Sequence, residues 1–289
     1  MSASTALLTH ERLAEASERL APLPAAANRL TAMLGDDDVD VRAIVDIVTY
    51  DPVLTAILLG QANSAHSGYV RATSTVSEAV VRLGLGAVAA IAMRTAVAQS
   101  LRQSLPVYGL EGDEVFAHSI KTAVAAEVLR SLCPTRIPAA TPTIALLHDV
   151  GKIIISDVLG SRALELVGKL TDVEGLSLID AELAVFGLHH AQAGVHAIRR
   201  WKLPLSFVEA VGNHHSAAGR GSALAEAVRV ADVLAHAIDQ GTDSLSAGGG
   251  RRFDATTALY ELDIHSWSHG QVLSDIEKRY EWVQGMMAA

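Results

Sequence analysis

The sequence predicts an all-α protein. Half of its 289 residues are apolar but only 4% are aromatic, so the core must be built mainly from Ala, Leu, Val and Ile. Small aliphatic side chains favour closely packed helices over a β-sandwich. Apolar residues also recur at helical spacing along most of the chain, and no convincing strand or internal repeat is found. We therefore expect helices throughout.

Capping residues mark where helices of the first half should begin. Asp51-Pro52 suits a helix start, because a carboxylate caps free N–H groups and proline fits the first helical position. The segment 53–62 that follows is apolar on nearly all sides, so we expect it to be deeply buried. Thr75 and Glu78 have the spacing of a capping box for the next helix.

The segment Pro106 to Gly112 should join two helical parts. We assign residues 1–108 to an N-terminal helical subdomain and 109–289 to a larger bundle with C-terminal helices. Small residues of the helix 87–101 allow close packing, so the two parts should share an apolar interface. Ser206 to Glu209 is expected to cap a helix, and Gly241 to Arg252 to form a flexible loop. Other helices of the second part are expected near 114–132, 177–187, 191–201, 222–238 and 272–286.

One stretch, Ile144 to Lys152, ends an apolar helix in an imidazole, a carboxylate and an ammonium group. His148 and Asp149 can both reach one cation if it sits over the helix edge. Lys152 lies on the same side, where it could neutralise an anionic oxygen. We therefore assign catalytic roles to Asp149 and Lys152. In the alternative interpretation His148 caps the helix and Asp149 is solvated.

Further histidines and carboxylates occur on other apolar helices, and side chains from several helices can converge inside a bundle. Imidazole and carboxylate ligands together suit iron, manganese, zinc or nickel. A bridging Asp149 would allow two ions, as in phosphoester hydrolysis. The alternatives are that these histidines fill the core and that Glu114 is an ordinary surface glutamate. The candidate metal ligands are Glu114, His118, His148, Asp149, His190, His214, His215 and Asp232, whereas His196, His236, His265 and His269 are interpreted as surface or capping residues.

Composition excludes several classes of partner. The formal net charge of −9 argues against a broad nucleic-acid or anionic-membrane surface. The single cysteine, Cys133, rules out an internal disulfide and fits a reducing compartment. The N-terminus lacks the pattern of a signal peptide, and no uninterrupted apolar run approaches the ~18 to 20 residues of a membrane span. These features predict a cytoplasmic protein without a membrane or nucleic-acid partner.

The order of His118, His148-Asp149 and Asp232 resembles that of HD-superfamily phosphohydrolases. The chain is more specifically similar to the HDOD family of bacterial signalling output domains, over roughly Arg12 to Asp232. This resemblance implies an HD-like helical bundle, a role in signal transduction and protein partners in signalling. The similar segments are Leu20-Ala-Pro-Leu-Pro24, Asp51-Pro52, Ala62-Asn-Ser-Ala65, Ala79-Val-Val-Arg-Leu-Gly84, Leu147-His-Asp-Val-Gly-Lys152, His190, Trp201-Lys-Leu-Pro204 and His214-His215.

Two departures from related families bear on activity. HDOD proteins are commonly described as regulatory relatives that have lost part of the catalytic set, whereas this sequence holds a complete set. HD-GYP phosphodiesterases carry a glutamate one turn before the first histidine, which Glu114 matches, and a Gly-Tyr-Pro motif after the paired histidines. Ser216 to Gly221 replaces that motif here, so we expect little hydrolysis of cyclic-di-GMP.

Three functions are compatible with the sequence. The one that the sequence favours, narrowly, is a signalling output protein whose metal site is structural or senses a ligand. The second is a metal-dependent phosphohydrolase acting on a nucleotide or cyclic dinucleotide. The third is a metal-free scaffold that binds protein partners.

Overall fold

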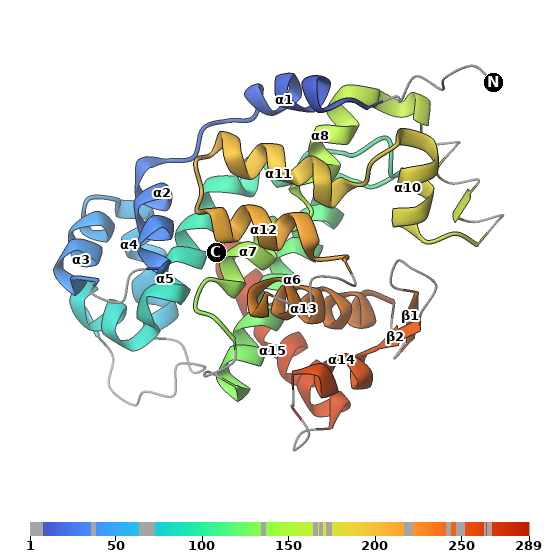
Figure 1. The fold of residues 1–289 in the computed structure, drawn as a ribbon. Helices are drawn as coiled ribbons and strands as arrows, with labels where there is room; N and C mark the ends of the chain where they lie inside the picture. The colour runs from blue at the N-terminus through green and yellow to red at the C-terminus, as the bar shows by residue number, and fades with distance from the viewer. Residues whose placement is uncertain are drawn as a thin grey trace, which may run out of the picture.

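The structure is a computed structural model that describes residues 8–35, 39–63, 73–133, 137–163, 167, 170–171, 175–216, 222–240, 244–246, 252–262, 264 and 268–288. Almost all regular structure in these residues is helical, which confirms the predicted fold class (Figure 1). The α-helices are α1 (His10–Glu18), α2 (Ala25–Ala32), α3 (Val41–Thr49), α4 (Pro52–Ala62), α5 (Val76–Leu101), α6 (Gly112–Leu132), α7 (Thr141–Leu147), α8 (Val150–Leu159), α10 (Leu178–Phe186), α11 (His190–Arg200), α12 (Leu205–Asn213), α13 (Ala223–Gln240), α14 (Ala255–Glu261) and α15 (His269–Ala288). Two short 3₁₀ helices, η1 (Met33–Gly35) and η3 (Gly160–Ala163), follow α2 and α8.

One small ribbon departs from the helical pattern. Strand β1 (Ser244–Ser246) pairs antiparallel with β2 (Arg252–Asp254), and Leu245 lies opposite Phe253. Strand β1 and the first residue of β2 lie within the segment predicted as a flexible loop, and the rest of that loop lies outside the described residues. The ribbon is too short to change the all-α class.

Several helix starts follow the predicted capping chemistry. The carboxylate of Asp51 accepts a hydrogen bond from the Leu54 N–H at 3.0 Å, and Thr75 accepts one from Glu78 at 3.3 Å. The predicted cap at Ser206 is wrong, because α12 already begins at Leu205, after Pro204, without a side-chain cap. The expected deep burial of α4 is also wrong: only one face packs on α3 and α5, and Val53 is 59% exposed.

The core has two parts that meet along α5. Helices α2 to α4 and the first half of α5, as far as Ala92, form a smaller cluster. From Met93 onward α5 enters a larger cluster with α1, α6 to α8 and α10 to α15. Helix α1 lies against α8 and α11 although its residues fall in the predicted N-terminal subdomain (Figure 1). The division at residue 108 therefore stays a prediction.

Helix α5 is strongly apolar. An 18-residue window within it has a mean hydropathy of 1.7, enough for a membrane span by length and composition. Arg82 and Arg94 interrupt the helix, so it contains no uninterrupted apolar run of ~18 residues. The pair α3 and α4 passes the same test together but is bent by 118°. Half of the α5 window is buried in the protein, where the helix packs on α2, α3, α4, α6 and α7. This burial is what the core helix of a folded domain requires.

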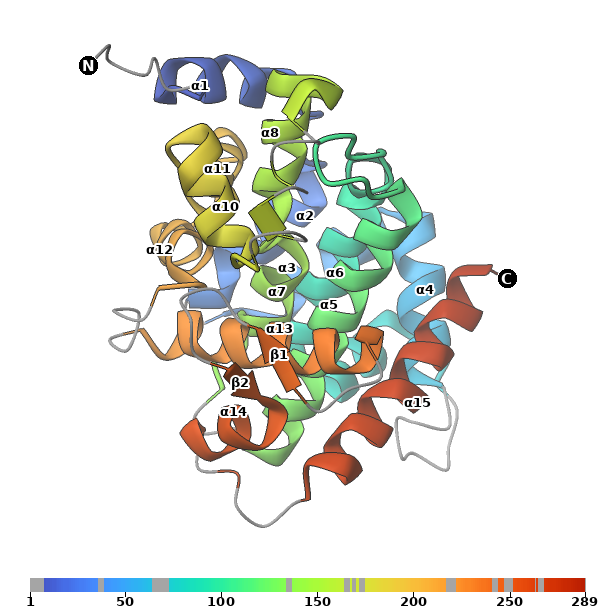
Figure 2. The same cartoon turned by 90° about the vertical axis from the view of Figure 1, so that its right-hand side faces the viewer.

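Figure 2 shows how the second part of the chain is arranged around α6. Helices α7, α13 and α15 pack against α6, and α12 lies beside α13. Helix α11 crosses α8 and also contacts α12. Helices distant in sequence thus surround the turn between α7 and α8.

Candidate metal centre

His148 and Asp149 occupy the turn that joins α7 to α8, where two apolar helices meet in the core. Both side chains are buried, with 1% and 3% of their residue surface exposed. The Nδ1–H of His148 donates to the Ala145 carbonyl at 2.7 Å. Because a carbonyl can only accept, this bond leaves the Nε2 lone pair of a neutral ring facing the centre.

His190 reaches Asp149 because α8 and α11 cross closely. A Cβ placed on Gly151 would lie 1.9 Å from the His190 carbonyl oxygen and 2.5 Å from the Gly194 nitrogen. Glycine at position 151 therefore lets the backbones approach each other. As a result, Nε2 of His190 lies 3.1 Å from Oδ1 of Asp149.

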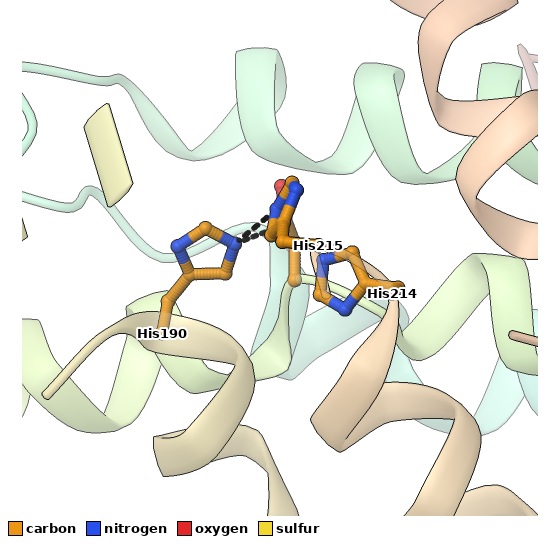
Figure 3. Close-up of side chains that lie close together, drawn as sticks. His190, His214 and His215 are labelled. Carbon is orange, nitrogen blue, oxygen red and sulfur yellow. Dashed lines mark hydrogen bonds and ion pairs between the residues drawn. The ribbon is translucent and has the colours of Figure 1, made fainter. Parts of the chain in front are cut away.

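The paired histidines end α12 beside His190. His214 Nδ1 donates to the Val211 carbonyl at 2.7 Å, so its Nε2 also faces the centre. Nε2 of His215 lies 2.9 Å from Nε2 of His190, and Figure 3 shows the three rings together. The structure thus brings both members of the pair to the centre: His214 is buried and His215 half-buried.

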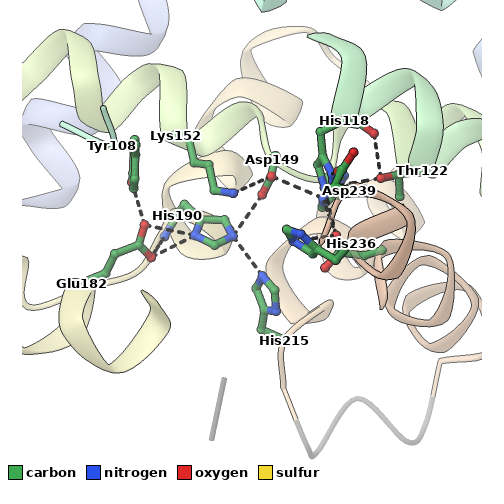
Figure 4. A network of polar contacts seen from close by, with 12 residues as sticks. Tyr108, His118, Thr122, Asp149, Lys152, Glu182, His190, His215, His236 and Asp239 are labelled. Atoms are coloured by element: carbon green, nitrogen blue, oxygen red, sulfur yellow. Dashed lines mark hydrogen bonds and ion pairs between the residues drawn. The ribbon is translucent and has the colours of Figure 1, made fainter. Parts of the chain in front are cut away.

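Helices α6 and α13 close the other side. Nε2 of His118 lies 3.0 Å from Oδ1 of Asp232, and its Nδ1 lies 2.9 Å from Oδ2 of Asp239. His236, one turn after Asp232, places its Nε2 3.5 Å from Oδ1 of that aspartate. Lys121 pairs with Asp239 (Figure 4 shows His118, His236 and Asp239). One face of α13 therefore supplies two carboxylates and an imidazole.

The unpaired atoms of this cluster fit a metal ion. Two buried ring nitrogens, Nε2 of His148 and Nε2 of His214, have no hydrogen-bond partner in the described part of the chain. Nε2 of His148 lies 3.3 Å from Oδ1 of Asp232, and Oδ1 of Asp149 lies against Nε2 of His190. Buried ring nitrogens are costly when left unsatisfied, and a cation among these carboxylates would satisfy both. Potential ligand atoms lie within 4.8 Å of one another in three groups: Asp149, His190, His214 and His215; His118, His148 and Asp149; and His118, Asp232 and His236. Because Asp149 belongs to two groups, the arrangement can hold two ions that share it.

The histidines of the cluster differ in pKa, because their charged neighbours differ. Burial opposes charge on His118, but hydrogen bonds to Asp232 and Asp239 raise its pKa to about 9. Burial likewise opposes charge on His190, but Glu182 and Asp149 raise its pKa to about 9. Burial and neighbouring histidines lower the pKa of His214 to about 3.

The two central carboxylates stay ionised. Burial opposes charge on Asp149, but His148 and Lys152 hold its pKa well below the usual value. Burial also opposes charge on Asp232, but His236 and His148 hold its pKa low. The metal-free centre thus combines anionic carboxylates with the protonated rings of His118 and His190.

One predicted ligand is not brought to the centre. Glu114 is exposed, and its carboxylate accepts a hydrogen bond from the Glu111 N–H at 2.7 Å in the capping box of α6. A glutamate three residues after the helix-capping position satisfies that N–H locally, one turn before His118. The assignment of Glu114 as a metal ligand is therefore corrected.

His236, interpreted as a surface or capping residue, is partly exposed but also reaches the cluster. It lies in the cluster with His118 and Asp232, and burial together with His118 lowers its pKa to about 4. The signal that could have found it is its spacing of four residues from Asp232 on one helix. His189, which precedes His190, is the capping residue of α11. His265 and most of the segment that replaces the Gly-Tyr-Pro motif, residues 217–221, lie outside the described residues.

Two further side chains support His190 and were missed. The carboxylate of Glu182, fully buried on α10, lies 2.9 Å from Nδ1 of His190. The Tyr108 hydroxyl donates to the same carboxylate at 2.6 Å (Figure 4). The sequence does show Glu182 as a carboxylate on an apolar helix, but its spacing does not indicate that His190 is its partner. Lys152, predicted to act here, lies with its Nζ 2.6 Å from Oδ2 of Asp149.

Replacing Glu182 by glutamine should weaken metal binding by about 10- to 100-fold. The carboxylate orients His190 and raises the basicity of the ring atom that faces the centre, and loss of such a partner has effects of about this size. Metal affinity can be measured by competition with a chromophoric chelator. Tyr108→Phe, which removes one bond to Glu182 but keeps the charge, is expected to have a smaller effect. Equal affinities for wild type and Glu182→Gln would contradict this role.

Comparisons with known proteins agree with the fold. A protein of Geobacter sulfurreducens with an HDOD domain is 23% identical, with 93% of this chain and 98% of that chain covered and a TM-score of 0.68. A Shewanella amazonensis protein named "Putative phosphohydrolase" is 23% identical, with 95% and 96% covered and a TM-score of 0.64.

Sequence comparison extends this result. An uncharacterized protein of Treponema pallidum is 23% identical over 210 residues; the match covers 71% of this chain but only 39% of that protein. The HDOD domain family matches residues 20–217, more than half of the chain, and includes the turn with His148 and Asp149. The chain therefore belongs to the HDOD family.

Proposed function

We propose that this protein is a metal-dependent phosphohydrolase built on the HDOD fold. The observation that carries the proposal is the sharing of Asp149 between two groups of buried ligands. Two divalent ions, when bound, would activate a water molecule as the nucleophile and stabilise the negative charge of a phosphate. The name of the Shewanella amazonensis relative is consistent with this chemistry.

The candidate centre has a buried side, which would bind the ions, and a side that is open to solvent. His148, Asp149, His190 and His214 are buried and would hold the ions in fixed positions. The His236 side chain is 39% exposed, so substrate would approach from the α13 side. Its low pKa keeps this imidazole neutral near pH 7, so it is able to bind a cation.

Two ammonium groups lie at the edges of the centre. Burial opposes the charge of Lys152, but Asp149 raises its pKa, so the group remains a cation at neutral pH. It holds the Asp149 carboxylate in place and offers positive charge to a phosphate oxygen. Lys121, paired with Asp239, lies on the α6 side.

A regulatory protein without turnover is the second candidate. Its support is the depth of the ligands, since His148, His190 and His214 are each at most 1% exposed. Such an enclosed centre suits a structural or sensing metal. HDOD membership supports this signalling role and, with it, protein partners.

Turnover separates the two candidates. Metal-stripped full-length protein would be loaded with iron(II), manganese, zinc or nickel, and its metal content measured. Hydrolysis would then be followed with bis(p-nitrophenyl) phosphate and a nucleotide panel that includes cyclic-di-GMP. We expect metal-dependent hydrolysis of at least one nucleotide, with little on cyclic-di-GMP. Metal-loaded protein without turnover on any substrate would favour the regulatory candidate, and protein that takes up no metal would exclude both.

Metal affinity should rise with pH. With pKa values of about 9, His118 and His190 are protonated at neutral pH in the metal-free protein. A metal must displace their protons, so affinity falls as pH falls below 9, by up to about tenfold per unit for each proton displaced. Chelator competition at pH 6.5, 7.5 and 8.5, with proton release followed by an indicator dye, measures this effect. An affinity that does not change over this range would contradict the protonation states.

A further inference from the structure

A cavity lies away from the metal centre, between the first half of α5, the C-terminal end of α6 and α15. Its volume is about 680 Å³, within the range of pockets that bind small molecules. Segments of α5, α6 and α15 form its walls, together with the start of α7. None of the candidate metal ligands lines it. The cavity is therefore a separate site.

The walls of this cavity carry an excess of positive charge. Four cationic side chains line it, Arg82, Arg130, Lys278 and Arg279, against two carboxylates, Glu127 and Asp275. The local balance of +2 (four minus two) contrasts with the net charge of −9 for the whole chain. A local excess of positive charge in a cavity produces a positive electrostatic potential there, which attracts anions.

One of these cations has unused hydrogen-bonding capacity. The Nε of Arg130 is buried and has no hydrogen-bond partner in the described part of the chain. Arg279, by contrast, already lies 3.4 Å from Glu127 and stacks over Trp282. Arg130 lines the cavity, and a guanidinium matches the oxygens of a phosphate.

The remaining walls are mostly apolar, with Gln61 and Ser131 as the polar exceptions. Leu83, Val128 and Pro142 line the cavity beside the charged groups. A ligand that satisfies both surfaces carries an anionic group and a flat apolar or weakly polar part. Inorganic phosphate would use only the charged wall.

We propose that this cavity binds a nucleotide, with the phosphates against Arg130 and Lys278 and the base against the apolar wall. The proposal is independent of the phosphohydrolase function, because it concerns a cavity with its own lining.

Calorimetric titration of full-length, metal-stripped protein in EDTA tests this site with ATP and with pyrophosphate. We expect saturable binding of ATP that is tighter than that of pyrophosphate. Arg130→Gln and Lys278→Gln should each weaken ATP binding by about tenfold or more, as loss of a charge-assisted hydrogen bond does. Arg42→Gln, which removes an exposed cation outside the cavity, is the matched control and should bind as wild type.

Three outcomes would overturn the proposal. The first is the absence of saturable ATP binding to the folded protein. The second is equal affinity for pyrophosphate and ATP, which would leave the apolar wall unused. The third is ATP binding that survives both cavity substitutions but is lost in His118→Ala, which would place the nucleotide at the metal centre. Metal content and turnover, measured separately, decide the phosphohydrolase function whatever the result here.

Discussion

Asp149→Ala should remove metal binding and phosphoester hydrolysis together. Asp149 belongs to two ligand groups, so its loss disturbs both ion positions rather than one. Hydrolysis should fall by at least about a thousandfold, roughly 4 kcal/mol in the activation free energy. The metal content of the purified variant and its initial rate on the best wild-type substrate are the measurements.

Helix α8, which follows Asp149, offers a matched control. Asp157 lies on the exposed side of α8, where it pairs with Arg19. Asp157→Ala should keep both metal and activity and change the free energy of unfolding by at most about 1 kcal/mol, because exposed ion pairs contribute little. Asp149→Ala protein that retained the wild-type metal content would show that Asp149 is not a shared ligand. Circular dichroism checks that each variant folds.

Gly151→Ala is expected to destabilise the fold by roughly 3 kcal/mol or more. The added Cβ would meet backbone atoms of α11, which cannot move aside as a flexible side chain could. Overpacking of this kind typically costs about 1 to 3 kcal/mol, and contact with backbone places this case at the upper end. Urea unfolding of metal-stripped protein measures the change in the free energy of unfolding without a contribution from bound ions.

Gly285→Ala is the corresponding control on α15. Nothing lies within 4 Å of a Cβ added there. The substitution should leave stability unchanged or raise it by about 0.5 to 1 kcal/mol, because alanine loses less backbone entropy than glycine in a helix. If Gly151→Ala and Gly285→Ala lowered the free energy of unfolding by similar amounts, the close approach of α8 and α11 would be contradicted.

The fold class could be predicted because its causes are local. Apolar spacing predicted the helices, and Asp51 and Thr75 marked two of their starts through their own side chains. Burial was harder to predict, since it depends on which neighbours cover a helix. The apolar segment 53–62 therefore gave no sign that Val53 would face outward.

The candidate centre shows the same limit. His118, His148, Asp149 and Asp232 stand out as polar residues on apolar helices, and the structure brings them together. Glu114 has the same helical spacing to His118 that His236 has to Asp232, yet only His236 turns inward. Spacing indicates which side chains share a helix face, but the packing of that face decides whether they reach the centre. The carboxylate of Glu114 instead accepts a hydrogen bond from the nearby N–H of Glu111.

The bond between His118 and Asp232 joins residues 114 positions apart. An ion held at that point would link α6 to α13 only while the chain is folded, so it would stabilise the fold by mass action, by about 4.1 kcal/mol when its concentration is a thousand times the dissociation constant. The sequence has one cysteine and cannot form such a link through an internal disulfide. In a cell short of the metal, the protein would unfold more often and become more open to proteolysis. Metal supply would then set how long each copy of the chain survives.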